Sequence, residues 1–230
     1  MKNYLVLYEA GKAGTWLTWL INQHANFPQY KLIEQERDNL KQQLDVACLG
    51  ADFLWQEHDY SESVKRSQRF IVNKEHTKRC VKVIPNHELR CLKDTSKPSI
   101  EYLDKVIPQL NPDLIVWPIL SDTMIEEFTL RWYVIWHVSR GMMPGELHGL
   151  EFFREGILSK YQRQAVKIYS RYAPVYQVDI GRLIKADYHQ DEYLRLADAI
   201  GEKPLADISQ IALDYRMWAF ADIMDKVGRP

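Results

Sequence analysis

The 230-residue sequence has few cysteines and no excess of charge of either sign. Its three cysteines, Cys48, Cys80 and Cys91, form no CxxC pair. An odd number of thiols without that spacing argues against a disulfide framework and favours a reducing, cytoplasmic location. Thirty Lys and Arg residues against 31 Asp and Glu residues give a formal charge of -1. This balance makes nucleic acid an unfavourable partner, so any function that depends on charge must be local.

A long hydrophobic run is also missing. The N-terminal segment MKNYLVLYEAGK contains only a short apolar stretch before Glu9 and Lys12. A signal peptide needs a longer apolar stretch and a small-residue cleavage site. No segment approaches the roughly 20 apolar residues that span a membrane. We therefore expect no membrane partner and a cytoplasmic protein.

The hydrophobic content of 46% is enough to bury a core, and the length suits a single domain over residues 1–230. Short runs rich in Val, Ile and Leu alternate with longer amphipathic segments, a pattern typical of a parallel sheet covered by helices. The sequence thus predicts an α/β fold with three layers, a central parallel sheet flanked by helices. The predicted strands are Tyr4–Tyr8, Arg79–Ile84, Leu114–Ile119 and Val175–Asp179. The predicted helices are 14–24, 31–46, 99–109, 122–140, 150–171, 188–200 and 208–226.

Residues 65–93 form a basic band, with nine Lys or Arg residues against Glu75 and Glu88. One interpretation is a solvated face of a strand and its loops. The other is a surface that meets an anionic cofactor or substrate.

The segment 4–21, YLVLYEAGKAGTWLTWLI, has the pattern of a phosphate-binding loop. An apolar strand leads into a turn with two glycines and Lys12, and a helix opens near Thr15. Glycines let the backbone approach an anion, and the N–H groups and dipole of a helix start attract negative charge. Because Gly11-Lys12 is followed by Ala13, the spacing differs from that of a Walker A motif. An ordinary ATPase or kinase is therefore a poor fit.

The order Lys-x-Gly-Thr after the first strand, followed by an aromatic residue and leucines, resembles the sulfotransferases. In the C-terminal region, VYQVDIGRLI (175–184) and YLRLADAIGEKPL (193–205) are similar to that family's last strand, turn and helix. The resemblance implies a P-loop-like sulfotransferase architecture and 3'-phosphoadenosine 5'-phosphosulfate as the donor, without a metal. It also implies that Lys12 contacts the transferred group. The loop residues that would bind the cofactor are Gly11, Lys12, Ala13, Gly14, Thr15 and Trp16.

The sequence departs from the family at the expected 3'-phosphate site. Family members place an arginine at the end of a middle strand and a serine about eight residues later, but Trp117 and Pro118 stand near the arginine position here. Ser121 is the predicted cofactor-binding hydroxyl, and Thr123 is a second one. Arg131 or Arg140 could supply the positive charge from the next helix.

The catalytic base is the second departure. The segment VKVIPNH (81–87) has Ile84 at the family's histidine position, and His87 follows three residues later. His87 is the candidate base, with His76 and Glu9 as rivals. A competing pattern, H-x3-C-x6-H-x3-C, joins His76, Cys80, His87 and Cys91 as conceivable zinc ligands. Alternation along the intervening strand would scatter these side chains, so no metal site is assigned.

These features leave two classes of function. In the first, the chain is a short, divergent sulfotransferase that acts on a hydroxyl or amine of a small-molecule or carbohydrate acceptor, with Lys12 and His87 as catalytic residues. In the second, the fold persists without chemistry, as an interaction or structural component with protein partners or as an oligomer. Short relatives of sulfotransferases occur in phage genomes, so a virion component belongs to this alternative, and the expected cytoplasmic location includes the cytoplasm of an infected host. Other phosphate-binding enzymes remain as a third class.

Overall fold

The computed structural model describes residues 1–8, 13–27, 76–83, 100–138, 149–158, 162–185 and 189–216. Strands and helices alternate along these segments, as expected for an α/β protein. Residues 208–216 form a further helical segment near the C-terminus. The labelled elements are β1 (Lys2–Leu7), α1 (Gly14–Ile21), β2 (Lys78–Val83), α4 (Ile100–Leu110), β3 (Leu114–Ile119), α5 (Asp122–Val138), α6 (Leu150–Leu158), α7 (Gln162–Tyr169), β4 (Val175–Asp179), α8 (Ile180–Ile184) and α9 (His189–Ala199).

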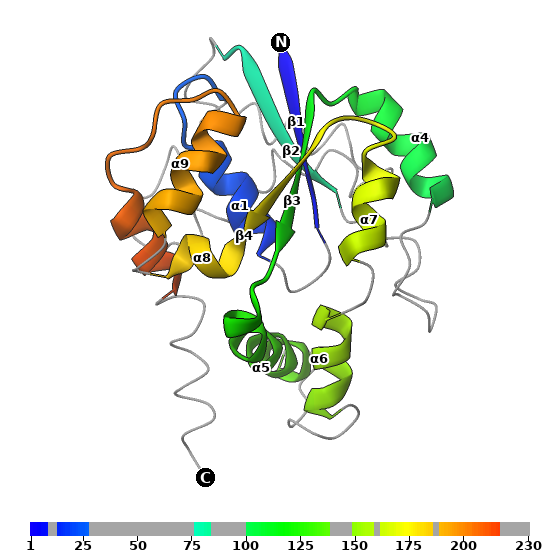
Figure 1. Ribbon diagram of the computed structural model, residues 1–230, viewed down its shortest axis with the longest axis vertical. Coiled ribbons are helices and arrows are strands. Elements are labelled where there is room, and N and C mark those ends of the chain that lie inside the picture. Colours follow the sequence, from blue (N-terminus) through cyan, green and yellow to red (C-terminus); the bar gives the residue numbers. More distant parts are fainter. Residues whose placement is uncertain are drawn as a thin grey trace.

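The four described strands form one parallel sheet in the order β2-β1-β3-β4. The chain moves from β1 outward to β2, then crosses to the other side of β1 to form β3 and β4. This reversal creates a topological switch point at the carboxyl ends of β1 and β3, where open parallel sheets bind their ligands. Figure 1 shows these ends pointing toward α5 and α6.

Helices cover both faces of the sheet because consecutive apolar side chains along its strands point to opposite faces. On β1, Tyr4 and Val6 belong to a core shared with α1, α8 and α9. Leu5 and Leu7 point the other way, into a core shared with α4 and α7. Figure 1 shows the same two groups of helices on opposite sides of the strands. The expected α/β class, with a parallel sheet and flanking helices, is confirmed.

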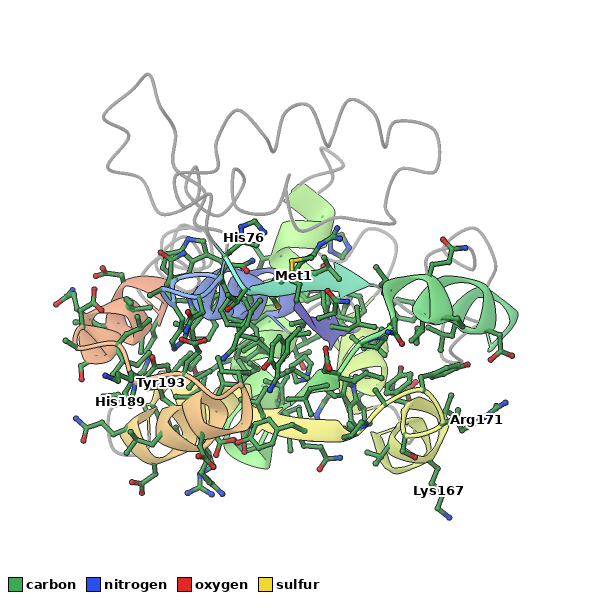
Figure 2. All side chains as sticks on the ribbon, turned by 90° about the horizontal axis from the view of Figure 1, so that it is seen from above. Met1, His76, Lys167, Arg171, His189 and Tyr193 are labelled. Carbon is green, nitrogen blue, oxygen red and sulfur yellow. The ribbon has the colours of Figure 1, made fainter. Side chains whose placement is uncertain are left out.

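Figure 2 shows the molecule from above, with labelled side chains from the helices on each side of the sheet. His189 and Tyr193 of α9 lie at one side of the sheet. Lys167 of α7 and Arg171, just beyond it, lie at the other. His76 and Met1 are close together in the same view, since β1 and β2 begin in register with Lys2 opposite Lys78.

Pro118 lies inside β3, a central strand, which is unusual because proline has no N–H to give to the sheet. The pairing of β3 with β1 ends at Val6 opposite Val116, whereas its pairing with β4 continues to Ile119 opposite Asp179. By the alternation of a parallel ladder, the next rung toward β1 would need the missing Pro118 N–H. Pro118 thus ends the β1–β3 pairing at the switch point.

The strands match the sequence prediction closely: Leu114–Ile119 and Val175–Asp179 are confirmed to the residue, and the other two begin and end one or two residues earlier. The single helix predicted over 150–171 is wrong. Its first part, α6, packs against α5, and its second part, α7, packs against the sheet. The helical spacing of apolar residues continues through α6 and α7. It therefore does not reveal that the two helices pack against different parts of the protein. The predicted helix 31–46 lies outside the described residues. None of the helices described is both long and apolar enough to cross a membrane.

Candidate functional site

The candidate site lies where β1 ends and α1 begins. Ala13 precedes α1 with φ 54° and ψ 22°, in the left-handed region that non-glycine residues adopt uncommonly. A left-handed residue followed by a helical one turns successive N–H groups toward one side, a geometry that binds anions. The N-cap residue Ala13 has no side chain that could cap α1, and the first turn of the helix has no acidic residue. The first N–H groups of a helix have no partner within it. The backbone at Ala13–Trp16 therefore suits a bound anion.

Gly14 has a packing role that the sequence did not reveal. A Cβ atom at this position would lie 1.9 Å from Cγ of Tyr8, the residue that follows β1. The Tyr8 ring is buried and lies directly against the first residue of α1. Close contact between the strand end and the helix start thus requires glycine, in addition to any role in anion approach.

Trp16 contributes to the site only through its backbone, because its side chain is 1% exposed. Its ring stacks on Tyr215 with centroids 4.2 Å apart and an interplanar angle of 18°. Burial raises the pKa of Tyr215, and the nearby positive charge of Arg131 partly opposes that shift. Arg131 of α5 is therefore within electrostatic reach of the residue that packs on the first turn of α1.

The rest of α1 is buried on all sides. Leu17, Leu20 and Ile21 are completely covered, as expected for residues that face the sheet. Thr18 and Asn22, which the helical spacing places on the same side as Gly14, are also only 1% exposed. The Thr18 hydroxyl donates to the Gly14 carbonyl at 2.8 Å. It is thus used within the helix, whereas Ala13 at the start of α1 is partly exposed.

Ser121, the predicted cofactor-binding hydroxyl, lies at the carboxyl end of β3 and faces β4 and α8. Its N–H donates to Oδ1 of Asp179 at 3.1 Å, and the N–H of Arg182 donates to the same oxygen at 3.1 Å. A Cβ atom on Gly181 would lie 2.4 Å from the Ser121 Oγ. We call Ser121, Asp179 and Gly181 the β3–β4 joint. A carboxylate occupies this joint and caps α8.

A second carboxylate supports the joint from α9. The Asp179 N–H donates to Oε1 of Glu192 at 3.0 Å. Glu192 is 5% exposed in its side chain and is held by Arg195 at 2.6 Å. These contacts fix the end of β4 and leave the Asp179 carboxylate at the carboxyl edge of the sheet.

Trp117, at the position where the family has an arginine, is a core residue. It is fully buried, and its ring meets Tyr169 of α7 edge to face at 5.7 Å. Val116 belongs instead to the core on the α1 side of the sheet. The middle strand LIVWPI therefore brings no cationic side chain to the carboxyl edge.

Several predicted residues cannot be placed. Gly11, Lys12, His87, Glu9 and Arg140 lie outside the described part of the chain, as does the side chain of Thr15. Their proposed roles stay predictions.

Two residues of the predicted zinc pattern, His76 and Cys80, lie in the described part of the chain, and they do not support a zinc site. Cys80 is 1% exposed in the core, and burial raises the pKa of its thiol. Such a thiol stays protonated, whereas zinc binds the thiolate. Among the described residues, no three His, Cys, Asp or Glu side chains are grouped as metal ligands.

Part of the basic band is structural. Lys78 is buried at the start of β2, where its Nζ donates to the carbonyls of Ile200 and Gly201 at 2.7 and 2.6 Å. It also pairs with Glu202 at 2.5 Å. Lys78 therefore neutralises the carbonyl end of α9, and its charge is not available to a ligand.

Asp179 is the residue that the sequence analysis missed. An Asp at the end of a strand and before Ile-Gly-Arg-Leu-Ile has the pattern of a helix N-cap, which could have identified it as a cap. Its contact with Ser121 could not be predicted, because the two residues are 58 positions apart. A search with models of protein families found no match to this sequence. A search of curated proteins also found no match.

Proposed function

We propose that the chain binds the 5'-phosphosulfate end of a nucleotide at the start of α1 and transfers its sulfuryl group to an acceptor. The resemblance to sulfotransferases implies 3'-phosphoadenosine 5'-phosphosulfate as the donor, and the part of that donor on which this proposal depends is the 5'-phosphosulfate. The acceptor is a hydroxyl or amine of a small molecule or carbohydrate. One observation carries the proposal: a left-handed Ala13, whose side chain cannot cap the helix, precedes α1 at the switch point of a parallel sheet.

The roles of the residues follow from this placement. The N–H groups of Gly14, Thr15 and Trp16 hold the 5'-phosphate, with help from the dipole of α1. Lys12 stabilises the negative charge that develops on the bridging oxygen as the sulfur–oxygen bond breaks. The acceptor oxygen or nitrogen forms the new bond to sulfur, and His87 takes the acceptor proton.

Binding and turnover test the proposal together. We expect adenosine 3',5'-bisphosphate or 5'-AMP to bind in isothermal titration calorimetry, with weaker binding of ATP. Lys12→Ala should weaken binding by about 10- to 100-fold, the value of a charge-assisted hydrogen bond. His87→Ala should lower sulfuryl transfer by about 10²–10⁴-fold with nucleotide affinity unchanged.

Lys167→Ala is the matched control, since Lys167 is an exposed lysine on α7 at the side of the sheet away from α1. It should bind nucleotide like the wild type. Wild-type affinity in a folded Lys12→Ala protein would contradict the assignment of the loop.

A second function, nucleotide binding without transfer, is favoured by the buried Trp117 at the expected arginine position. A chain of this kind would act as an interaction or structural component. It would bind 5'-AMP in the same titration and show no sulfuryl transfer with any acceptor.

A further inference from the structure

The β3–β4 joint already holds a negative charge at the place where a second phosphate would be expected. Oδ1 of Asp179 accepts from the N–H groups of both Ser121 and Arg182 at 3.1 Å. Backbone N–H groups at the starts of helices that follow parallel strands are the donors that bind phosphate in many α/β proteins. Here the carboxylate of the chain itself uses them, so a second anion at Ser121 would meet occupied donors and a like charge.

Nothing on β3 offsets this charge. The strand and the residue after it, from Leu114 to Leu120, contain no charged side chain. Trp117 is buried against Tyr169 on the face covered by α4 and α7. β3 itself therefore brings no positive charge to the Asp179 carboxylate at the carboxyl edge.

The joint lies within reach of a nucleotide bound at α1. β3 separates β1 from β4, and neighbouring strands lie about 4.8 Å apart, so the ends of β1 and β4 are about 10 Å apart. A ribose 5'-phosphate with a hydrogen bond of about 3 Å at each end covers this separation. A ligand anchored by its 5'-phosphate at Gly14 therefore brings its ribose toward the joint.

We infer that Asp179 makes the site selective against a 3'-phosphate, so that the chain prefers a nucleotide whose ribose carries a free 3'-hydroxyl. A hydroxyl can donate to a carboxylate, whereas a phosphate is repelled by it. This inference rests on the proposed function for its 5'-phosphate site. It replaces the donor implied by the resemblance with one that has a 5'-phosphosulfate and an unmodified ribose.

The test compares 5'-AMP with adenosine 3',5'-bisphosphate by isothermal titration calorimetry at low salt. In the wild type, 5'-AMP should bind at least about tenfold tighter, the order expected of one like-charge contact near a protein surface. Asp179→Asn keeps an N-cap acceptor but removes the charge, so it should bring the two affinities to within about threefold. Asp179→Ser serves as a second uncharged cap if the Asn variant is unstable.

Asp198→Asn is the matched control, because Asp198 is an exposed aspartate of α9. It should keep the wild-type ratio of affinities. Tighter binding of the bisphosphate by the wild type would overturn the inference and leave the proposed function intact. If Arg131→Gln or Arg182→Gln then abolished the tighter binding of the bisphosphate, the guanidinium of that arginine would be the group that binds the 3'-phosphate. Binding of neither nucleotide would overturn the proposed function itself.

Discussion

At residue 14 the space for a side chain is already filled by the ring of Tyr8. This contact fixes how the end of β1 meets the start of α1, and with it the direction of the first N–H groups of the helix. Ala13 adds a left-handed turn just before them. The geometry of the candidate anion site therefore depends on a few backbone atoms more than on any polar side chain that the structure describes.

Gly14→Ala should destabilise the protein through this contact. The added Cβ would lie 1.9 Å from Cγ of Tyr8, so the ring or the helix must shift. Overpacking of this kind costs about 1–3 kcal/mol. For a domain of this size, each kcal/mol lowers the midpoint of thermal unfolding by about 2–4 °C.

Gly149→Ala is the control, because a Cβ at Gly149 would have no neighbour within 4 Å. It should unfold at the wild-type temperature. A Gly14→Ala protein as stable as the wild type would show that the Tyr8 ring moves aside at no cost.

At the scale of single elements, two strands do more than supply core residues. β3 contains Pro118, which ends its pairing with β1 at the switch point. β2 begins with Lys78, whose ammonium group binds the carbonyl end of α9 and Glu202. The rings of Tyr4 and Phe27 lie 5.9 and 5.8 Å from this ammonium group. The contact between β2 and the end of α9 is thus a buried, charged contact that lies next to two aromatic rings.

Lys78→Met should lower the free energy of unfolding by about 3–5 kcal/mol, the usual cost of removing one partner from a buried ion pair. The reason is that Glu202, 5% exposed in its side chain, would lose its cationic partner. Urea unfolding followed by circular dichroism measures the change. Lys203→Met, at the exposed neighbouring lysine, should change the free energy by less than about 0.5 kcal/mol. Equal stability of the two variants would contradict a structural role for Lys78.

At the scale of the whole molecule, a buried hydrogen-bonded chain joins the end of α1 to the C-terminal region. The Leu205 N–H donates to the Tyr193 hydroxyl at 2.6 Å, and that hydroxyl lies 2.9 Å from Nε2 of His24. Nδ1 of His24 lies 3.0 Å from the Ile21 carbonyl and must donate to it. Nε2 is then the acceptor, so the network fits a neutral imidazole. Burial raises the pKa of Tyr193 to about 12, which keeps its hydroxyl protonated.

This network predicts that stability falls in mild acid. Burial lowers the pKa of His24, and the nearby charges of Glu202 and Lys78 act in opposite directions on it. Because the folded pKa is below the unfolded value of about 6.5, the contribution of neutral His24 is complete above that pH. It is lost as the pH falls toward the folded pKa, by up to about 1.4 kcal/mol per pH unit.

Urea midpoints measured from pH 7.5 to pH 5 check this dependence. His24→Gln cannot titrate and should show a flatter profile than the wild type across that range. His189→Gln is the control, since His189 bonds Ser209 near the surface, and it should keep the wild-type slope. Parallel profiles for wild type and His24→Gln would assign the acid sensitivity to other groups.

The sequence by itself determined the α/β class, the four described strands and the start of α1 after β1. These features depend on local patterns, namely the period of the apolar residues and the places of glycine and proline. The role of Lys78 escaped this reading, because a basic band in the sequence does not show which of its lysines is buried. The roles of Lys12, from the resemblance, and of His87, the nearby histidine where the chain departs from the family, stay predictions.

The tertiary structure alone decided what surrounds the candidate site. It placed the switch point between β1 and β3, buried Trp117 on the face away from α1, and set the Asp179 carboxylate against the N–H of Ser121. Each of these depends on contacts between residues far apart in the chain. Local propensity carries no information about such contacts, because strand order and the side on which each helix crosses decide which distant residues meet.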